Sequence, residues 1–333
     1  MKKKFLILGA NSFSGSTFVN YLLNENQIVY GTFHSSKKKI NLTYLFNKNY
    51  KNFTNIKIDS SREKDINKLI KILKKIKIDY IIDFSSICMV DYSWKNPAYY
   101  FKVNVQSKID LIQKLIDIKF DKYILISTPE VFGSKSQILT ENSILHNPST
   151  PYALSKSYQE KYMDLIFKKN NLNFNICRFS NFYGPGQATY RLIPRIIYSI
   201  LFNKKIVIQG KGEAVRSFIY SKDFCDGIYK VLKYSKKNKT YHFSNKEFLT
   251  IFEVYKVICE LMKVTYNNYF EFGAKRIHED PSYKLKCSNS ENDLNWKPQY
   301  DIKKGVSETI EYFTKNKILF RNSDLQFNKN LYI

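Results

Sequence analysis

Short apolar runs alternate with longer amphipathic stretches over roughly the first 180 residues of the chain. The runs have the length of strands, and the longer stretches repeat their apolar positions at helical spacing. We expect strands at residues 4–9, 27–33, 55–59, 79–84, 121–127 and 174–179, and helices at 16–24, 64–76, 97–118 and 151–169. Because nearly continuous apolar strands interleaved with helices are buried on both faces, the pattern predicts an α/β fold with a doubly wound parallel sheet.

The pattern loosens after about residue 180 into shorter elements with more turn residues, crossed by helix candidates at 191–202, 250–263 and 302–315. We expect a sheet domain made of residues 1–180 together with about 217–245. Residues 181–216 and 246–316 are expected to form a smaller α/β lobe that binds substrate. The last residues, 317–333, are polar and aromatic without periodicity and are expected to form a loosely attached tail.

A glycine turn follows the first expected strand, in the stretch ILGANSFSGSTF. Gly9 and Gly15 bracket it, and Ser12 stands where a strict dinucleotide fingerprint has its middle glycine. A turn that opens a helix after the first strand of a parallel sheet can hold a pyrophosphate with backbone amides. The turn therefore indicates a Rossmann-like domain with a dinucleotide cofactor.

The end of the second expected strand, GTFHSSKKK, carries no carboxylate to bind the ribose 2′-hydroxyl of NAD. His34, Ser35, Ser36 and Lys37 could instead accept a 2′-phosphate. This favours NADP over NAD as the cofactor.

The formal net charge of +25 raises the question of nucleic-acid binding. The lysines are scattered along the chain among abundant Asn, Ile, Tyr and Phe, which is typical of a solvated surface, so no nucleic-acid partner is expected. Five cysteines without paired spacing and four separated histidines predict no metal site. No apolar stretch reaches membrane-spanning length and the N-terminus is too short for a signal peptide, so we expect a cytoplasmic protein without a membrane partner.

Several segments resemble, in order along the chain, motifs of the extended short-chain dehydrogenase/reductase family of epimerases and dehydratases. The resemblance runs from about residue 4 to 315 and is most similar to nucleotide-sugar 4,6-dehydratases of the dTDP-glucose 4,6-dehydratase type. It implies an NDP-hexose substrate, a tightly held nicotinamide cofactor and a 4-keto-6-deoxy sugar product. The segments are DFSSICMVDYSWKNPAYYFKVNVQSKIDLI, STPEVFG, PYALSK, RFSNFYGPGQ, RSFIYSKDF and LNWKP.

A tyrosine and a lysine four residues apart occur at Tyr44, Tyr152, Tyr229 and Tyr300, but only Tyr152 opens a helix after the fifth strand. Tyr152 and Lys156 share a helix face, and a nearby ammonium favours the phenolate, which can then accept a hydroxyl proton from a sugar. The resemblance implies that Thr128 hydrogen-bonds the same hydroxyl. A surface tyrosine with a solvated lysine is the alternative.

Glu130 follows the fifth strand, where the simple epimerases of the family have no acid. Once C4 of a hexose is a ketone, a carboxylate there can remove the C5 proton, so Glu130 favours a dehydratase. A turn-capping role is the alternative. Pro129 departs from the family pattern, which has an aspartic acid as proton donor; Glu130, Thr128 or a water would have to replace it. A C4 epimerase or a sugar-acid decarboxylase on the same fold also remains open, as does a non-catalytic binding protein.

The resemblance implies further roles. Asn181, Arg216 and Arg276 would hold the sugar diphosphate, and Arg191 would lie near the nucleotide. The catalytic set is Thr128, Glu130, Tyr152 and Lys156, and the substrate set adds Cys88. The cofactor set is Gly9, Asn11, Ser12, Phe13, Ser14, Gly15, His34, Ser35, Ser36, Asp59, Phe84, Ser85, Ser86, Asn104, Ser127, Tyr152 and Lys156.

The family also pairs the helices at 97–118 and 151–169 into a dimer interface. Both helices carry more apolar residues than one buried face requires, which favours a homodimer. These residues are Val103, Val105, Ile109, Ile112, Leu115, Tyr158, Tyr162, Leu165 and Ile166.

Overall fold

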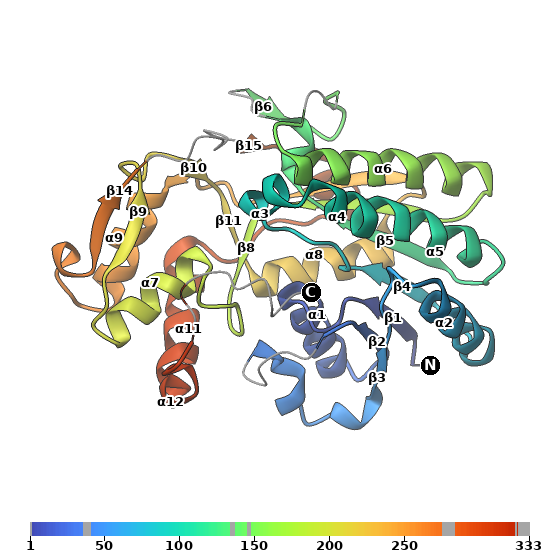
Figure 1. The fold of residues 1–333 in the computed structure, drawn as a ribbon, viewed down its shortest axis with the longest axis horizontal. Helices are drawn as coiled ribbons and strands as arrows, with labels where there is room; N and C mark the ends of the chain where they lie inside the picture. The colour runs from blue at the N-terminus through green and yellow to red at the C-terminus, as the bar shows by residue number, and fades with distance from the viewer. Residues whose placement is uncertain are drawn as a thin grey trace.

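The computed structural model describes residues 2–35, 41–133, 137–144, 148–274, 284–323 and 325. A seven-stranded parallel sheet forms its centre, in the order β12-β7-β5-β4-β1-β2-β3 (Figure 1). The predicted fold class is therefore confirmed. The strands are β1 (Lys4–Leu8), β2 (Ile28–Phe33), β3 (Phe53–Lys57), β4 (Tyr80–Asp83), β5 (Lys122–Ser127), β7 (Phe174–Phe179) and β12 (Lys239–Phe243).

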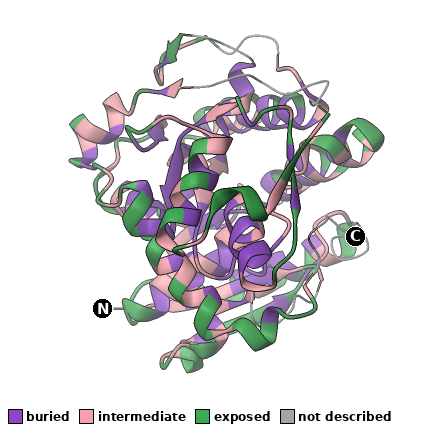
Figure 2. Cartoon of the chain, turned by 90° about the vertical axis from the view of Figure 1, so that its left-hand side faces the viewer, coloured by how far each residue is buried: buried purple, intermediate pink, exposed green. Residues whose placement is uncertain are grey.

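Helices cover both faces of the sheet, which explains why the central strands β1, β4 and β5 are mostly apolar. Helices α1 (Phe13–Asn24) and α8 (Ser221–Tyr234) pack on one face. Helices α2 (Glu63–Ile76), α5 (Ser107–Leu115) and α6 (Pro151–Lys169) pack on the other. Figure 2 shows the buried residues gathered in the sheet and on the inward sides of these helices.

The stretch predicted as one helix at 97–118 consists of three pieces. It begins with α4 (Pro97–Phe101), continues through a π-helical turn (Lys102–Gln106) and ends with α5. A π turn inserts an extra residue into the helical repeat and is frequent at functional sites. A short helix, α3 (Val90–Lys95), precedes α4. Residues 84–89 connect the end of β4 to the start of α3.

A separate apolar core lies beside the sheet and packs α7 (Leu192–Leu201), α9 (Ile251–Leu261) and α11 (Ile302–Lys315). Two pairs of short strands edge it: β9 (Ile206–Gln209) with β14 (Phe270–Gly273), and β10 (Val215–Arg216) with β13 (Leu249–Thr250). The lobe boundaries predicted from the sequence remain a prediction. The other small elements are β6 (Ile138–Leu139), β8 (Asn181–Tyr183), β11 (Phe218–Tyr220), β15 (Lys284–Leu285), α10 (Ser288–Leu294) and the 3-10 helices Thr43–Phe46, Tyr50–Asn52, Pro129–Phe132 and Tyr266–Asn268.

Two expectations need correction. The chain after residue 316 does not begin as a loose tail, because α12 (Lys317–Phe320) follows α11 and Phe320 is buried in the same core. Ile112 and Leu115, predicted to face a dimer partner, are instead buried against the sheet. Counting apolar residues on this helix could not predict which of them face the sheet and which face outward. The π turn rotates the helix faces relative to a regular α-helical repeat.

Candidate active site

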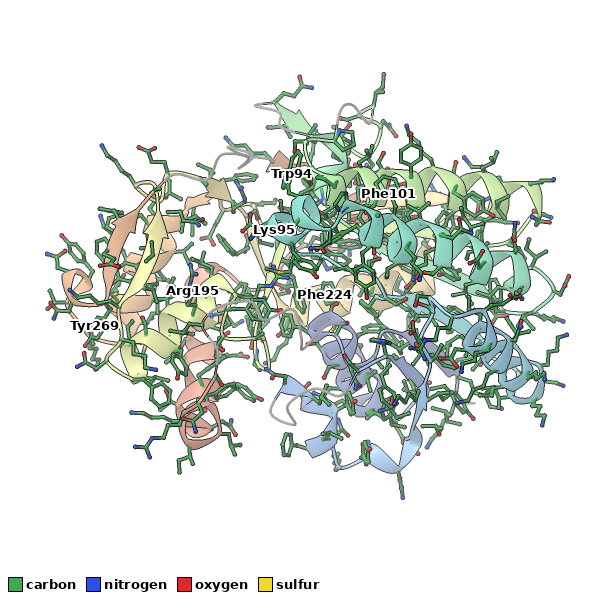
Figure 3. The ribbon with its side chains drawn as sticks, in the orientation of Figure 1. Trp94, Lys95, Phe101, Arg195, Phe224 and Tyr269 are labelled. Atoms are coloured by element: carbon green, nitrogen blue, oxygen red, sulfur yellow. The ribbon has the colours of Figure 1, made fainter. Side chains whose placement is uncertain are left out.

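A cavity of about 740 Å³ opens at the carboxyl ends of the central strands, between the sheet and the core built on α7. Side chains from both parts border it: Arg195 comes from α7 and Phe224 from α8 (Figure 3). The cavity lies over the junction between β1 and β4, where the strand order reverses direction. This is the position at which doubly wound sheets bind their ligands.

The glycine turn fits the pyrophosphate of a dinucleotide. Gly9 has a φ of +78°, and a Cβ there would lie 3.0 Å from the Cα of Ser85. A Cβ on Gly15 would lie 2.2 Å from the carbonyl oxygen of Gly9, so both positions require glycine. Ser12 caps α1 by accepting the Gly15 amide at 3.0 Å. Ser12, Phe13 and Ser14 line the cavity, and no acidic side chain stands in the first turn of α1 to repel an anion.

Polar groups gather where β2 and β3 end. Asn11 accepts a hydrogen bond from the Tyr44 hydroxyl at 2.6 Å and donates to the Ser35 carbonyl oxygen at 3.4 Å. His34 Nε2 lies 3.5 Å from a carboxylate oxygen of Asp59, and these two side chains border the cavity with Asn11 and Ser35. Asp59, two residues after β3, thus places a carboxylate beside the end of β2. Ser36 and Lys37 lie outside the described residues.

The segment after β4 forms the middle wall of the cavity, where Phe84, Ser85, Ser86 and Cys88 all line it. Asn104, assigned to the cofactor from the sequence, is fully buried behind this wall instead. Its side chain accepts the Ile87 amide at 2.9 Å, donates to the Ile87 carbonyl at 3.1 Å, and donates to Ser155 Oγ at 3.0 Å.

The structure brings all four predicted catalytic side chains and Ser127 to the same cavity at the end of β5. Thr128 is the N-cap of the 3-10 helix Pro129–Phe132, and its Oγ1 accepts the Glu130 amide at 3.3 Å. Pro129 occupies the first helical position, where a missing N–H costs nothing. Tyr152 enters from the first turn of α6, a helix capped by Thr150, and all of these residues line the cavity.

The Tyr152 phenol is buried beside an acid. Burial raises its pKa well above the ordinary value, and the Glu130 carboxylate raises it further. A hydrogen bond with Thr128 and the charge of Arg191 act in the opposite direction. Thr128, Glu130 and Arg191 therefore all lie within electrostatic reach of the same hydroxyl. Lys156, expected from the sequence to lower this pKa, is not among its main influences here.

Lys156, the fourth predicted catalytic residue, directs its ammonium at three acceptors of the protein. It donates to Ser86 Oγ at 3.1 Å, to the Ile126 carbonyl at 3.0 Å and to Gln159 Oε1. Burial lowers the pKa of Lys156 to about 8. Gln159 was missed in the sequence, although its place one helical turn after Lys156 on α6 was a usable signal.

One side of the cavity is basic. Asn181, Arg191 and Arg216, for which a substrate-binding role remains a prediction, line it, and Arg191 Nη2 lies 3.2 Å from Cys88 Sγ. Arg195, one turn after Arg191 on α7, also lines the cavity and was not singled out from the sequence. Arg276 lies outside the described residues. Guanidinium groups at these places suit a diphosphate, to which they bind bidentately.

Over the described part of the chain, no group of three or more His, Cys, Asp or Glu side chains is placed to hold a metal ion. None of the helices in those same residues is both long and apolar enough to cross a membrane.

Comparison with known proteins agrees with this geometry. The family model described as GDP-mannose 4,6 dehydratase matches residues 6–309. The dTDP-glucose 4,6-dehydratase of Haemophilus influenzae is 26% identical over 93% of this chain and 98% of its own length. The dTDP-D-glucose 4,6-dehydratase of Bos taurus is 28% identical over 74% of this chain and 71% of its own length.

Solved structures show the same fold. The dTDP-glucose 4,6-dehydratase of Streptomyces venezuelae, with NAD bound, superposes with a TM-score of 0.85 at 26% identity, covering 94% of this chain and 98% of that one. The UDP-glucose 4-epimerase of Thermotoga maritima reaches 0.83 at 22% identity, covering 94% and 99%. The parallel sheet, glycine turn and Tyr-x-x-x-Lys helix define a short-chain dehydrogenase/reductase. The chain belongs to the extended branch of that family, the NAD-dependent epimerases and dehydratases.

Proposed function

We propose that the protein is a nucleotide-sugar 4,6-dehydratase, a hydro-lyase that converts an NDP-hexose into an NDP-4-keto-6-deoxyhexose. One observation carries the proposal: the Glu130 carboxylate shares the cavity with Thr128 and Tyr152 and lies close enough to influence the tyrosine. A proton acceptor for the sugar hydroxyl and a second base for the C5 proton are thereby both present. The named dehydratases among its relatives support the same reading.

The residues divide the reaction among them. A nicotinamide cofactor held by the glycine turn and by residues 84–86 would supply a reversible hydride acceptor. Tyr152 would accept the proton of the C4 hydroxyl as C4 is oxidised to a ketone, and Thr128 would orient that hydroxyl. Because burial and Glu130 raise the pKa of Tyr152, the reactive phenolate would depend on the positive charge of a bound, oxidised nicotinamide ring. Glu130 then removes the C5 proton, which the ketone has made acidic, and the C6 hydroxyl leaves as water. The hydride taken from C4 would then return to C6, while a proton from solvent adds to C5 and Tyr152 releases the proton of the C4 hydroxyl. C4 is oxidised and C6 is reduced in one turnover, so no outside oxidant is needed.

The leaving hydroxyl needs a proton, and Pro129 has none to give. We assign this step to Glu130, which carries the proton abstracted from C5 to the C6 oxygen. Pro129 and Glu130 are adjacent in the 3-10 helix and both line the cavity, so the carboxylate follows directly the position that an aspartic acid would have occupied.

Product mass tests the proposal. The protein is incubated with dTDP-, UDP-, GDP- and CDP-hexoses, and the products are analysed by mass spectrometry. A product lighter by one water supports the dehydratase. An unchanged mass with inverted stereochemistry at C4 would identify an epimerase, and loss of carbon dioxide from a sugar acid would identify a decarboxylase; either result contradicts the proposal.

The choice between NAD and NADP is measured separately. The sequence at the end of β2 favours NADP, whereas Asp59 beside His34 places a negative charge that would repel a 2′-phosphate. The Streptomyces venezuelae relative contains NAD. Binding of NADH and NADPH is compared by nicotinamide fluorescence; tighter NADPH binding would bear out the sequence prediction, and tighter NADH binding would contradict it.

A further inference from the structure

The cavity wall at residues 85–89 is fastened from behind by side chains of a single helical stretch. Tyr100 OH accepts the Met89 amide at 3.1 Å and donates to the Met89 carbonyl oxygen at 2.5 Å. Asn104 makes the corresponding pair of bonds to Ile87. Lys108 donates to Ser85 Oγ. Residues 85, 87 and 89 of the wall are thus hydrogen-bonded to residues 108, 104 and 100 of the helix, respectively.

The two spacings match for a geometric reason. Four residues of a helix advance about 6 Å along its axis, and two residues of an extended chain advance about 6.6 Å. The π turn Lys102–Gln106 contains Asn104, and Tyr100 and Lys108 lie four residues before and after it. We call Tyr100, Asn104 and Lys108 the rail, and residues 85–89 the wall.

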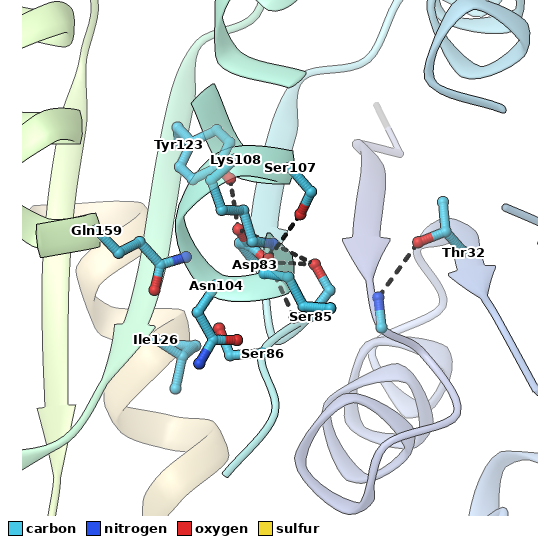
Figure 4. Close-up of polar contacts among 12 residues, drawn as sticks. Thr32, Asp83, Ser85, Ser86, Asn104, Ser107, Lys108, Tyr123, Ile126 and Gln159 are labelled. Carbon is cyan, nitrogen blue, oxygen red and sulfur yellow. Dashed lines mark hydrogen bonds and ion pairs between the residues drawn. The ribbon is translucent and has the colours of Figure 1, made fainter. Parts of the chain in front are cut away.

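One end of the rail is a buried ion pair. The Lys108 ammonium lies 2.8 Å from both carboxylate oxygens of Asp83, and the two side chains are 1% and 0% exposed (Figure 4). Asp83 also accepts from the Ser85 amide at 2.9 Å, from Ser85 Oγ at 2.6 Å and from Tyr123 OH at 2.7 Å. Although burial favours the neutral acid, the Lys108 charge holds the pKa of Asp83 below its usual value.

A buried ion pair contributes little net stability, because desolvating two charges offsets their attraction. The ion pair between Asp83 and Lys108 is better explained by the chain segment that it holds in place. Ser86 accepts from Lys156, and a Cβ on Gly9 would meet the Cα of Ser85 at 3.0 Å. Cys88 contacts Arg191. The wall therefore touches the catalytic lysine, the glycine turn and the basic side of the cavity, and a shift in it would move all three.

We propose that Asp83 and Lys108 are positioning residues: their buried ion pair anchors the wall and so sets the place of Lys156 and of the glycine turn. Neither residue lines the cavity, and both act through Ser85 and Ser86. The part of the test that measures turnover depends on the proposed function, whereas the part that measures the wall does not.

The experiment compares three variants of the full chain. Lys108→Met leaves Asp83 buried without its partner. Asp83→Val with Lys108→Met replaces the pair by apolar side chains of similar size. Lys122→Met is the matched control, because Lys122 is also a buried lysine, but it caps the end of α8 by donating to the Val231 and Leu232 carbonyls and to Ser235 Oγ. Melting temperature, amide hydrogen exchange of the wall, NADH and NADPH affinity and, with a substrate, kcat and KM are measured.

A positioning role predicts a specific split. Lys108→Met loses melting temperature and activity together. The double variant recovers most of the melting temperature, yet its wall amides exchange faster and its kcat falls about tenfold with little change in KM, as expected when bonds to charged groups are lost around a reacting centre. Lys122→Met loses melting temperature with unchanged kcat and unchanged exchange in the wall.

A double variant with both melting temperature and kcat restored would show that the pair is only structural and would overturn the proposal. If the double variant does not fold, hydrogen exchange of the wild-type protein still tests the proposal. Amides of Ser85 and Ile87 that exchange as fast as exposed loop amides would contradict the positioning role. If no nucleotide sugar is turned over, the proposed function fails, and wall exchange and cofactor affinity continue to test the anchor.

Discussion

The short stretch that contains Pro129 and Glu130 has a structural role and a proposed catalytic role. Thr128 caps and Pro129 starts a single 3-10 turn, and that turn places Glu130 in the wall of the cavity that Tyr152 also lines. The cap of this turn is Thr128, whose side-chain oxygen accepts the Glu130 amide.

Glu130→Gln separates the two halves of the proposed reaction. The amide cannot accept the C5 proton, but it leaves Tyr152 and Thr128 in place. We expect the bound cofactor to become reduced on mixing with substrate, seen by its absorbance, while water loss slows by roughly 100- to 10,000-fold. Normal product formation by this variant would contradict the role of Glu130.

Pro129→Asp tests the assignment of the proton donor. An acid at this cavity-lining position gives the leaving hydroxyl a donor of its own and suits the first turn of a helix. We expect faster water loss in single-turnover measurements, with a melting temperature close to that of the wild type. A slower or unchanged rate would show that Glu130 does not limit this step.

Lys122 gives a pH dependence of stability. Burial lowers its pKa to about 8 from an unfolded value of 10.5. Between these values the folded protein has lost the proton and the unfolded chain has kept it, so folding is increasingly favoured as pH rises, by up to about 1.4 kcal/mol per pH unit. The melting temperature of the wild type should rise relative to Lys122→Met from pH 7.5 to 9.5. A constant difference would contradict the pKa shift.

At the scale of elements, the N-terminus of α6 sets the catalytic tyrosine. Thr150 Oγ1 accepts the Ala153 amide at 3.1 Å, and Tyr152 lies between them in the first turn. Helix α9 has an equivalent cap, in which Thr250 accepts the Glu253 amide at 3.1 Å. Both caps use a threonine oxygen, and the α9 cap adds the Glu253 carboxylate, which accepts the Thr250 amide at 2.7 Å. The first turn of α6 carries Tyr152, whereas the first turn of α9 contributes only the apolar Ile251 to the cavity.

Thr150→Ala and Thr250→Ala form a matched pair. Each should cost about 1 kcal/mol of stability, which lowers the melting temperature by roughly 2–4 °C. Only Thr150→Ala should also lower kcat, because fraying of the first turn of α6 displaces Tyr152. Equal kcat values in both variants would show that the cap has no part in positioning the tyrosine.

At the scale of the whole molecule, α6 carries an apolar stripe on its outer side. Leu154, Tyr158 and Leu165 are 37%, 53% and 65% exposed and fall on one face of the helix. Helices α5 and α6 run side by side at the surface (Figure 1), so the stripe is accessible to a second copy. The homodimer expected from the sequence would use this face, without Ile112 and Leu115.

Leu165→Glu tests the dimer by sedimentation velocity. In a two-fold interface the introduced glutamate is present on both subunits, and the two like charges repel each other in an apolar contact. We therefore expect the variant to be a monomer while the wild type is a dimer. The control is Ile318→Glu, at an exposed apolar residue of α12 away from this face. A wild type that sediments as a monomer would contradict the prediction.

The sequence by itself determined six of the seven strands of the sheet and helices α1, α2 and α6, because burial on both faces gives a strand a continuous apolar pattern; β12 and α8 were not predicted. It also determined the glycine turn and Tyr152 with Lys156, whose partners are close in the chain. Only the tertiary structure decided which side chains meet across long separations. Packing brings together three pairs of side chains that are distant in the sequence: Asp83 with Lys108, His34 with Asp59, and Arg191 with Cys88. Local residue spacing cannot predict such contacts.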